Sequence, residues 1–528
     1  MQALEEYCDS PILNSVGCSN LAECLLNSIK KYKNNIAQID CNSGAKITFN
    51  DIKTKALTAS FCLNKAGIKR GDIVAICSSN NIDYCWQILA ILHCGACCSL
   101  VSPTATPREL IHNLNITKPK AVICENLNDK QLETILEREC VQYIWMNDEP
   151  SSVSKCKSVS ELLEDEDQVG YNRWSGLCPA IGTDPAFICS SSGSTGLPKG
   201  VLLTHNNLIS MLIYSELFMK KNGTALGLMP FYHAYGLGLM LMALNEGTRV
   251  AVLSKFSLVE FINAINMYQV THLHIVPSLL ATLAKNKEIM AENLKSIQEV
   301  YTGAGAIITK HQLALKSKLS KHAKLYHSYG MTETTFVVLF AESRYDKPGS
   351  SGKLLSGISA KIVSENGDEL GEGQIGELLL KGKTIMSGYL NNPEATSEAI
   401  DQHRWLHTGD LAYFDNDGYF YIVDRIKEMI KYQGYQVSPT EIEMVLLAHP
   451  GVSQVAVVGI PHETYGELPR AYVVRDKCGH SVTEEELQNL IKDELSPYKQ
   501  LRGGVCFVGS LPNSPTGKIQ KKILKSNS

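Results

Sequence analysis

The sequence lacks an excess of basic residues. Its 528 residues include 50 Lys and Arg against 54 Asp and Glu, which gives a formal net charge of -4. A protein that binds nucleic acid or an anionic membrane surface concentrates positive charge. The charge balance therefore argues against both kinds of partner. We expect a small-molecule partner and no nucleic acid.

The sequence also lacks a recognisable secretory leader. Met1 is followed by acidic residues, where a leader would have basic ones and then an apolar run. The apolar stretch from Ala225 to Leu244 contains Pro230, His233 and three glycines, which fits a buried strand-turn-helix segment better than a membrane span. The final Ser526-Asn-Ser is not a Ser-Lys-Leu peroxisomal address. We expect a cytoplasmic protein without stable membrane insertion.

The sequence also lacks the cysteine spacing of a metal site or of a disulfide framework. The 17 cysteines are odd in number and irregularly spaced. Cys94 and Cys97 form a CxxC, yet no second pair and no histidine lies at the spacing of a zinc finger. We therefore expect reduced core thiols in an intracellular protein.

What the sequence contains is the pattern of an α/β protein. Its length exceeds what one ordinary hydrophobic core accommodates. Apolar runs such as Asp72 to Cys77 and Thr248 to Leu253 alternate with amphipathic segments such as Ser257 to Tyr268, which predicts layers of helices and strands. Short apolar runs with frequent glycines from Gly352 to Val423 predict a small β-rich unit.

The composition changes again after Asp424, which indicates a second domain. Its expected elements are the helix Ser438 to Ala448, the strands Ser453 to Gly459 and Arg470 to Arg475, and the helix Thr483 to Leu495. We predict an α/β protein with a large N-terminal domain, residues 1–424, of layered α/β subdomains plus the β-rich unit. A small mobile α+β domain, residues 425–528, would follow a hinge at residues 424–427.

The most informative segment, Cys189 to Gly200, is rich in glycine, serine and threonine and ends near Lys199. Backbone N–H groups, hydroxyls and one lysine can surround phosphate oxygens in such a loop. It is not a Walker A loop, because no Ser or Thr follows the lysine. By composition alone, the segment also fits a flexible linker.

Seven further motifs follow this loop: Pro230 to His233, Thr302 to Ala306, Tyr329 to Thr335, Trp405 to Asp410, Asp424 to Lys427, Lys431 to Gln436 and Pro515 to Lys518. In order and spacing, the eight motifs resemble those of the adenylate-forming superfamily, which includes acyl- and aryl-CoA synthetases, peptide-synthetase adenylation domains and beetle luciferases. The resemblance extends from about residue 20 to the end of the chain. A flexible linker does not explain it.

The resemblance implies an ATP site. Its members would be Ser191, Ser192, Gly193, Ser194, Thr195, Gly196, Lys199, Gly303, Ala304, Gly305, Tyr329, Gly330, Thr332, Asp410, Arg425 and Lys518. Tyr329 would stack on adenine, and Asp410 would accept hydrogen bonds from the ribose with Arg425 assisting. Thr332, also assigned to catalysis, would contact the α-phosphate. Glu333 would hold Mg²⁺, a hard cation that prefers carboxylate oxygen.

The resemblance also implies an acyl pocket and two catalytic lysines. His233 would lie beside the reacting carboxylate, although a lone histidine in an apolar run usually belongs to the core. The remaining pocket residues would be Tyr235, Gly305, Phe336 and Val337. Lys518 would act when the adenylate forms, whereas Lys431 would act, with Gly434, when coenzyme A takes the acyl group. The small domain would rotate between two poses to present each lysine.

The implied activity is that of an AMP-forming acid-thiol ligase. It would use ATP and Mg²⁺ to convert a fatty or aromatic acid to an acyl-adenylate, release pyrophosphate, and pass the acyl group to coenzyme A. Gln433 is a departure, because many relatives carry a lysine there that would meet a phosphate of coenzyme A. The sequence predicts neither the native acid nor the oligomeric state.

Three alternatives stay open: a luciferase that oxidises an adenylated luciferin with O₂, a catalytically inactive binding protein that keeps the fold, and an adenylating enzyme that passes the acyl group to an amine. The retained lysines and carboxylates argue against inactivity. Against a luciferase, Met211 stands where beetle luciferases carry an arginine, and Phe336 and Val337 stand where they carry small residues. An apolar pocket suits a fatty or aromatic acid.

Overall fold

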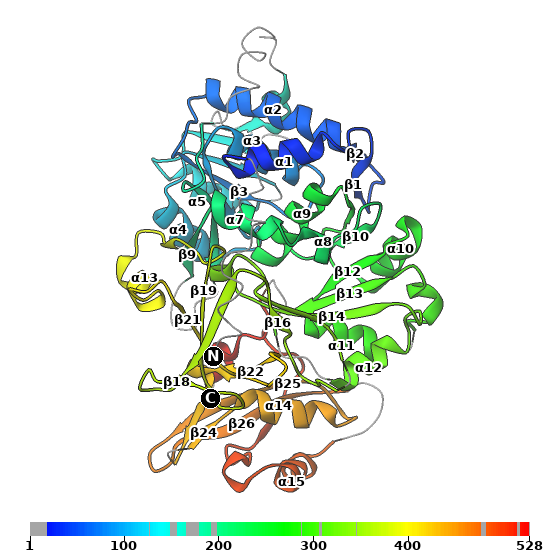
Figure 1. The fold of residues 1–528 in the computed structure, drawn as a ribbon, viewed down its shortest axis with the longest axis vertical. Coiled ribbons are helices and arrows are strands. Elements are labelled where there is room, and N and C mark those ends of the chain that lie inside the picture. Colours follow the sequence, from blue (N-terminus) through cyan, green and yellow to red (C-terminus); the bar gives the residue numbers. More distant parts are fainter. Residues whose placement is uncertain are drawn as a thin grey trace.

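The computed structural model describes residues 18–125, 127–147, 156–164, 179–191, 198–286, 288–305, 309–344, 346–433, 435–476, 482–514 and 518–526. Within them, three sheets form a large N-terminal part and a fourth sheet forms a small C-terminal part. The two parts follow one another along the long axis of the molecule (Figure 1).

The first two sheets are mostly parallel. In spatial order, the nine-stranded sheet contains β16 (Lys353–Leu354), β15 (Leu339–Glu342), β14 (Lys324–Tyr329), β13 (Glu299–Gly303), β12 (His272–Ile275), β10 (Thr224–Gly227), β11 (Arg249–Val252), β1 (Ile36–Asp40) and β2 (Lys46–Thr48). The eight-stranded sheet contains β20 (Gly388–Tyr389), β9 (Lys199–Thr204), β8 (Pro185–Ser191), β4 (Cys97–Val101), β3 (Ile73–Cys77), β5 (Ala121–Cys124), β6 (Tyr143–Met146) and β7 (Cys156–Ser158).

Helices cover these sheets, as parallel strands require. They are α1 (Leu21–Ile29), α2 (Phe49–Lys65), α3 (Tyr84–His93), α4 (Pro107–Thr117), α5 (Asp129–Leu136), α7 (His205–Leu212), α8 (Ser215–Phe218), α9 (Ala234–Glu246), α10 (Leu258–Tyr268), α11 (Pro277–Lys285) and α12 (Thr309–Lys316). The helices α1, α2 and α3 lie at one end of the molecule, and α10, α11 and α12 flank β12, β13 and β14 (Figure 1). The predicted α/β layers are confirmed.

The stretch Ala225 to Leu244, which is apolar enough to resemble a membrane span, folds as β10, a turn and the buried helix α9. None of the helices among the described residues combines the length and apolarity needed to cross a bilayer. The fourteen cysteines that the structure describes are free thiols, and Cys94 and Cys97 are buried. In those same ranges, three or more His, Cys, Asp or Glu side chains nowhere gather as a metal site.

The predicted β-rich unit is a third sheet of five antiparallel strands. Its strands are β18 (Glu369–Leu370), β17 (Ile358–Val363), β19 (Gly376–Gly382), β21 (Leu406–Phe414) and β22 (Phe420–Arg425), and α13 (Pro393–Ala399) precedes β21. Strand β22 pairs Arg425 with Asp410 of β21. The first residue after the expected boundary at 424 thus belongs to this sheet.

The C-terminal part has its own core, in which Ile430, Ile442, Val457 and Val473 are fully buried. Its sheet contains β24 (Tyr435–Val437), β23 (Ile430–Tyr432), β26 (Gly466–Arg475) and β25 (Val452–His462), with β27 (Val505–Phe507) also beside β26. The helices are α14 (Pro439–Ala448), α15 (Glu484–Glu494) and α16 (Lys521–Ser526). The structure thus has all four elements that the sequence predicts after residue 437.

Among the described residues, polar contacts connect the two parts at several points, and one of them is the Gln436 side-chain amide, which donates to the Glu365 carboxylate at 2.7 Å. Asp424 of β22 accepts hydrogen bonds from the Ser438 hydroxyl at 2.6 Å and the Thr440 N–H at 2.9 Å, so it stabilises the start of α14. In addition, Lys285 of α11 donates to the Val452 carbonyl at 2.9 Å, and Lys310 of α12 donates to the Ala448 carbonyl at 3.0 Å.

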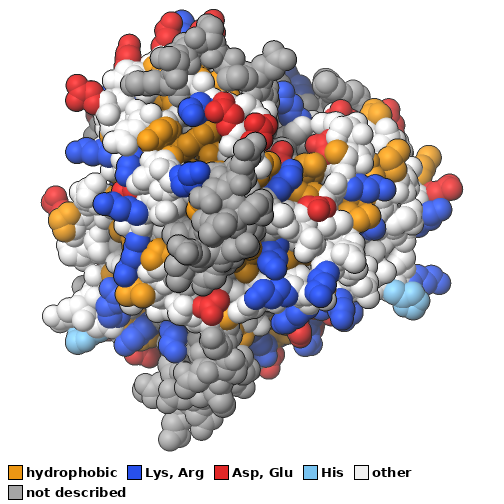
Figure 2. Space-filling view, turned by 90° about the horizontal axis from the view of Figure 1, so that it is seen from above, with side chains coloured by type: hydrophobic (Ala, Val, Ile, Leu, Met, Phe, Trp, Pro, Cys, Tyr) orange, Lys and Arg blue, Asp and Glu red, His pale blue; other side chains and the backbone are white. Residues whose placement is uncertain are grey.

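On the face shown in Figure 2, Lys and Arg side chains predominate across the middle and lower half of the view, and Asp and Glu side chains are scattered among them and toward the top.

Candidate active site

A cavity of about 320 Å³ lies where the nine-stranded sheet, the β-rich sheet and the C-terminal part meet. The residues expected at a nucleotide or acyl site that line it are Ser191, Lys199, His233, Tyr235, Gly303, Ala304, Gly330, Thr332, Glu333, Phe336, Val337, Arg425 and Lys518. They come from seven separate segments of the chain. The fold therefore brings most of the motifs to one place.

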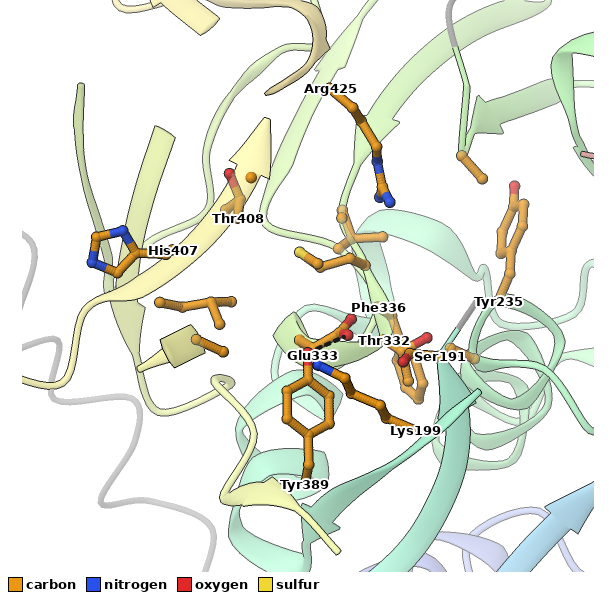
Figure 3. Close-up of a pocket in the computed structure, with 18 of the residues that line it drawn as sticks. Ser191, Lys199, Tyr235, Thr332, Glu333, Phe336, Tyr389, His407, Thr408 and Arg425 are labelled. Carbon is orange, nitrogen blue, oxygen red and sulfur yellow. Dashed lines mark hydrogen bonds between the residues drawn. The ribbon is translucent and has the colours of Figure 1, made fainter. Parts of the chain in front are cut away.

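Opposite charges meet on one side of the cavity. Glu333 belongs to a short 3₁₀ turn (Thr332–Thr334) and is buried, and its carboxylate accepts a hydrogen bond from the Tyr389 hydroxyl at 3.0 Å. The ammonium group of Lys199 lies 4.7 Å from the centre of the Tyr389 ring, a distance typical of a cation–π contact. Figure 3 shows the three side chains together. One carboxylate and one cation therefore face the cavity side by side.

A second set of polar side chains surrounds Asp410, which is only 3% exposed. Its carboxylate accepts a hydrogen bond from the Tyr329 hydroxyl at 2.6 Å, and the Arg425 guanidinium lies 3.1 Å away. Burial raises the pKa of Asp410, although Arg425 and Tyr329 act in the opposite direction. Four lone pairs of a carboxylate can accept hydrogen bonds, so the two neighbours leave capacity for a ligand hydroxyl.

Glycines allow the backbone to approach closely at two places. A Cβ at Gly303 would lie 2.5 Å from the Ser328 hydroxyl oxygen, and one at Gly330 would lie 1.7 Å from the Phe336 carbonyl oxygen. Between these strand ends, Ala304 has a left-handed φ of 66°. The wall formed by Gly303 and Ala304 is therefore narrow and lacks bulky side chains.

His233 and Lys518 reach the cavity from opposite parts of the molecule. His233 is the N-cap of α9, and its Nδ1 accepts from the Tyr235 N–H at 3.4 Å. Burial lowers the pKa of His233 to about 4, and the charge of Lys518 adds to this effect. Burial also lowers the pKa of Lys518, and the charge of Arg425 acts in the same direction. His233 is thus neutral near pH 7.

Apolar side chains form the remaining wall. Phe336 is 8% exposed and lines the cavity beside Val337 and Tyr235. Met211, by contrast, is fully buried in the core of α7 and does not line the cavity. Of the two differences from beetle luciferases, only the one at Phe336 and Val337 therefore bears on the shape of the cavity.

Several expected site residues lie elsewhere or outside the described residues. Of those that the structure describes, Gly305, Tyr329, Asp410 and Lys431 do not line the cavity. Asp410 lies directly behind it through its ion pair with Arg425, which lines the cavity, and Tyr329 lies there through its hydrogen bond to Asp410. Lys431 is exposed on β23 of the C-terminal part. The residues Ser192, Gly193, Ser194, Thr195, Gly196 and Gly434 lie outside the described residues.

The structure adds residues that the sequence reasoning missed. Tyr389 is one, and nothing in its short strand context marks it as a site residue. Glu377 is another, because its carboxylate accepts hydrogen bonds from the Gly409 N–H at 3.1 Å and lies 3.0 Å from the His407 ring nitrogen. His407 and Thr408 line the cavity, and their place in the motif ending at Asp410 could have identified them.

Two family models match the chain. The model described as AMP-binding enzyme matches residues 25–390, and the model described as AMP-binding enzyme C-terminal domain matches residues 441–518. The first match contains the cavity residues from Ser191 to Tyr389, and the second ends at Lys518.

Curated relatives of two kinds are similar over nearly the full chain. A probable CoA ligase of Humulus lupulus is 36% identical over 94% of this chain and 91% of its own length. A 4-coumarate–CoA ligase of the same plant is 33% identical over 94% of this chain and 92% of its own length. A luciferin 4-monooxygenase of Photuris pensylvanica is 34% identical over 93% of this chain and 91% of its own length.

Solved structures share the fold. ATP-bound MatB from Rhodopseudomonas palustris superposes with a TM-score of 0.83 at 26% identity, covering 96% of this chain and 98% of that one. The o-succinylbenzoate CoA synthetase of Bacillus subtilis, in complex with its acyl-adenylate, superposes with a TM-score of 0.80 at 25% identity and the same coverage.

Proposed function

The chain belongs to the AMP-binding enzyme family, and from that premise we propose that it is an ATP-dependent ligase that joins a carboxylic acid to coenzyme A. The first half-reaction forms an acyl-adenylate, in which an acid oxygen attacks the α-phosphorus of ATP and pyrophosphate leaves. In the second, the thiol of coenzyme A attacks the acyl carbon and AMP leaves. The observation that carries this proposal is the meeting of Lys518 with His233 and Arg425 in one cavity.

The polar groups of the cavity suit the first half-reaction. Adenylation brings a carboxylate against a triphosphate, so cations must neutralise charge that concentrates at the α-phosphate. Lys199, Arg425 and Lys518 supply three positive side chains around the cavity. Lys518 is proposed to bind the developing charge between the two reacting anions, and Lys199 to bind the outer phosphates.

His233 is proposed to orient the acid rather than to carry charge. Its pKa of about 4 keeps the ring neutral at physiological pH. Because Nδ1 accepts from the Tyr235 N–H, the proton of the neutral ring belongs on Nε2, where it can donate to a carboxylate. A neutral donor binds the acid without forming an ion pair that would weaken its nucleophilicity.

The nucleoside would lie against the group around Asp410. Arg425 and Tyr329 hold the carboxylate in one orientation, and its free lone pairs suit the two ribose hydroxyls. Because Gly303 and Ala304 carry no bulky side chains, the cavity has room for a flat base beside the Asp410 group. Stacking of Tyr329 on adenine remains a proposal.

The residues present also fit a magnesium ion. Glu333 offers a carboxylate beside Lys199, with one oxygen bound by Tyr389 and the other available. Magnesium in nucleotide sites takes one or two carboxylates plus phosphate oxygens and water, so a single carboxylate is sufficient. When bound, the ion would neutralise phosphate charge, and Tyr389 would hold Glu333 in position for it.

Pyrophosphate exchange tests the proposal. Purified protein with Mg²⁺ and ATP should incorporate labelled pyrophosphate into ATP only when a suitable acid is present, and should yield a thioester when coenzyme A is added. A panel of straight-chain acids, cinnamates, a dicarboxylic acid and beetle luciferin covers the chemistry of the similar proteins. The apolar wall at Phe336 and Val337 favours the uncharged acyl groups in this panel.

The alternatives give different results in the same experiment. Light with luciferin and O₂ would support the luciferase reading, which the similarity to luciferin 4-monooxygenases keeps open. Adenylate formation without a thioester would point to another acyl acceptor. Absence of exchange with every acid would indicate an inactive member and overturn the proposal.

A further inference from the structure

Hydrogen bonds of the backbone give the loop around Lys518 a defined shape. The Lys518 N–H donates to the Ser514 hydroxyl at 3.1 Å, and the Ser514 N–H donates to the Lys518 carbonyl at 2.7 Å. The Gln520 N–H donates to the Pro512 carbonyl at 2.8 Å. These bonds join the loop to itself, so the place of Lys518 in the cavity also depends on how the flanking residues attach to the C-terminal part.

Lys521 makes such an attachment at the start of α16. Its ammonium group lies 2.7 Å from the Glu443 carboxylate of α14 and 3.6 Å from the Glu428 carboxylate, just after the expected hinge. The side chains of Lys521 and Glu443 are only 17% and 15% exposed. The Glu443 oxygen that faces Lys521 also accepts from the Val457 N–H of β25 at 2.7 Å. One lysine therefore connects α16 to α14, to β25 and to the segment that joins the two parts.

Stability alone does not account for an ion pair in this place. Two charges lose hydration when they are buried, so apolar residues of similar volume often stabilise a fold equally well. The helix already has an apolar attachment, because Leu524 belongs to a buried cluster with Val458 and Tyr472. A charge-assisted hydrogen bond, unlike an apolar contact, is short and directional. The pair therefore fixes where α16 begins, three residues after Lys518.

The other two lysines of α16 offer a comparison. Lys525 lies 3.4 Å from the Glu467 carboxylate, and these side chains are 36% and 25% exposed. Lys522 is exposed. Exposed ion pairs contribute little to stability, because water solvates both partners. Of the three lysines, Lys521 is the one with a short ion pair between largely buried side chains.

We propose that Lys521 is a positioning residue for adenylation, which holds Lys518 in the cavity through its ion pair with Glu443. This inference rests on the proposed function and adds a residue to its machinery. Lys521 does not line the cavity, so it acts through the short link to Lys518. A cation stabilises a transition state best when it is already in place, because no reorganisation is then needed during the reaction. Anchoring the chain three residues away limits the positions that the Lys518 ammonium samples.

Substitution of Lys521 tests the proposal in each half-reaction. Lys521→Met should slow adenylate formation by about 10-fold to 10²-fold, the size of effect that follows when a reacting group is misplaced by about 1 Å. The loss should appear in kcat, with the KM for ATP nearly unchanged, because Lys521 does not line the cavity. Conversion of a supplied acyl-adenylate to the thioester should change much less. Lys521→Arg, which keeps a cation opposite Glu443, should retain most of the rate.

A double variant separates positioning from stability. Lys521→Met alone leaves the buried Glu443 carboxylate without its cation, which destabilises a fold. In Lys521→Met/Glu443→Gln that charge is gone and the amide oxygen can still accept from the Val457 N–H, so the Tm should recover. Adenylation should stay slow, because neither residue now fixes α16. Recovery of adenylation together with the Tm would overturn the proposal. The double variant also serves if Lys521→Met does not fold.

Lys522→Met is the matched control on the same helix. It removes one positive charge at an exposed neighbour of Lys521 and should leave both half-reactions unchanged. If it slows adenylation as much as Lys521→Met does, the net charge of α16 matters rather than the ion pair, and the positioning role of Lys521 falls.

Hydrogen exchange tests the positioning role without any substrate and so separates it from the proposed function. In Lys521→Met/Glu443→Gln, the amides of Ser514, Lys518 and Gln520 should lose protection, whereas those of β25 and β26 should keep it. Loss of protection in a protein that shows no pyrophosphate exchange with any acid would leave the positioning role standing and remove the ligase. Slow adenylation with unchanged protection of these amides would overturn the positioning role alone.

Discussion

Lys518 and Lys431 belong to the same C-terminal part of the chain but lie in different environments. Lys518 lines the cavity, and surrounding protein lowers its pKa. Lys431 is exposed on β23, and its backbone N–H donates to the Glu467 carboxylate at 3.0 Å. One lysine therefore reaches the cavity in this arrangement, and the other does not.

The difference indicates which arrangement of the two parts the structure adopts. With Lys518 beside His233 and Arg425, the cavity has the groups proposed for adenylation. A role for Lys431 requires the C-terminal part to turn about the segment after Asp424. The two-pose mechanism thus remains a proposal.

The largest expected effect comes from removing each lysine in turn. Lys518→Ala should slow adenylate formation by roughly 10²–10³-fold, the usual cost of removing one group that stabilises transition-state charge. Conversion of a supplied acyl-adenylate to the thioester should change much less. Lys431→Ala should show the reverse. Rapid-quench assays of each half-reaction measure the two effects separately.

The same pair of variants can contradict the two-pose mechanism. If both lose the same half-reaction, one arrangement performs both steps, and the assignments of Lys518 and Lys431 fall together. Circular dichroism on both variants serves as the folding control. An exposed lysine such as Lys431 should change the free energy of unfolding by less than about 0.5 kcal/mol.

The sequence predicts the architecture better than the details of the site. The alternating apolar and amphipathic segments yield the observed β3, β11 and α10, because periodicity follows from burial. The cap at Ser438 is local, so the start of α14 is also predicted. Tyr389 could not be found in this way, because its contact with Glu333 joins residues 56 positions apart.

The sequence likewise does not predict the arrangement of the two parts. The motifs around Lys431 and Lys518 indicate which residues take part, but one sequence is compatible with both poses. The close approach of Gly238 in α9 to the ring of Phe336 is similar, because nothing local relates these two residues. Long-range packing, which no periodicity encodes, determines both features.

The pH dependence of adenylation tests the role proposed for Lys518 but not for Lys431. The ammonium form is the active one, so kcat/KM should fall as pH rises through the pKa of Lys518. Because burial lowers that pKa, the alkaline limb of the pH–rate profile should lie below pH 10.5, the ordinary pKa of a lysine. His233, with a pKa of about 4, should add no limb near neutrality.

Lys518→Arg provides the control, because arginine stays protonated across the accessible range. Its absolute rate should be lower, but the alkaline limb should move out of the measurable range. A limb at the same pH in both proteins would mean that another group causes it.

A smaller effect is expected at the contacts that hold the present arrangement. Lys285 and Lys310 donate to carbonyls of Val452 and Ala448, across the junction of the two parts. Each such hydrogen bond contributes about 0.5–1.5 kcal/mol. Loss of both, about 1–3 kcal/mol, should slow adenylation by at most about 5–150-fold in the double variant Lys285→Met/Lys310→Met, whereas the thioester step should be unchanged or faster.

A substitution that removes a positive charge elsewhere on the large N-terminal part controls for nonspecific effects. Lys321 is exposed just before β14, and Lys321→Met should leave both half-reactions unchanged. If the double variant slows both half-reactions equally, these contacts stabilise the protein in general and do not select an arrangement.

The smallest expected effect concerns the face that carries Lys431. Gln433 is exposed, has a left-handed φ of 48°, and donates its N–H to the Tyr465 carbonyl at 3.0 Å. The backbone conformation is already strained for a side chain, so Gln433→Lys adds a charge without adding strain. If this face meets a phosphate of coenzyme A, the exposed pair should contribute about 0.2–1 kcal/mol. The KM for coenzyme A should then fall by about 1.5–5-fold, with adenylation unchanged.

Gln433→Met, which keeps the size but adds no charge, should have no effect. Because salt screens an exposed ion pair, raising the ionic strength should abolish the gain of Gln433→Lys. A gain that survives high salt, or that Gln433→Met reproduces, would show that coenzyme A does not meet this face through its phosphates.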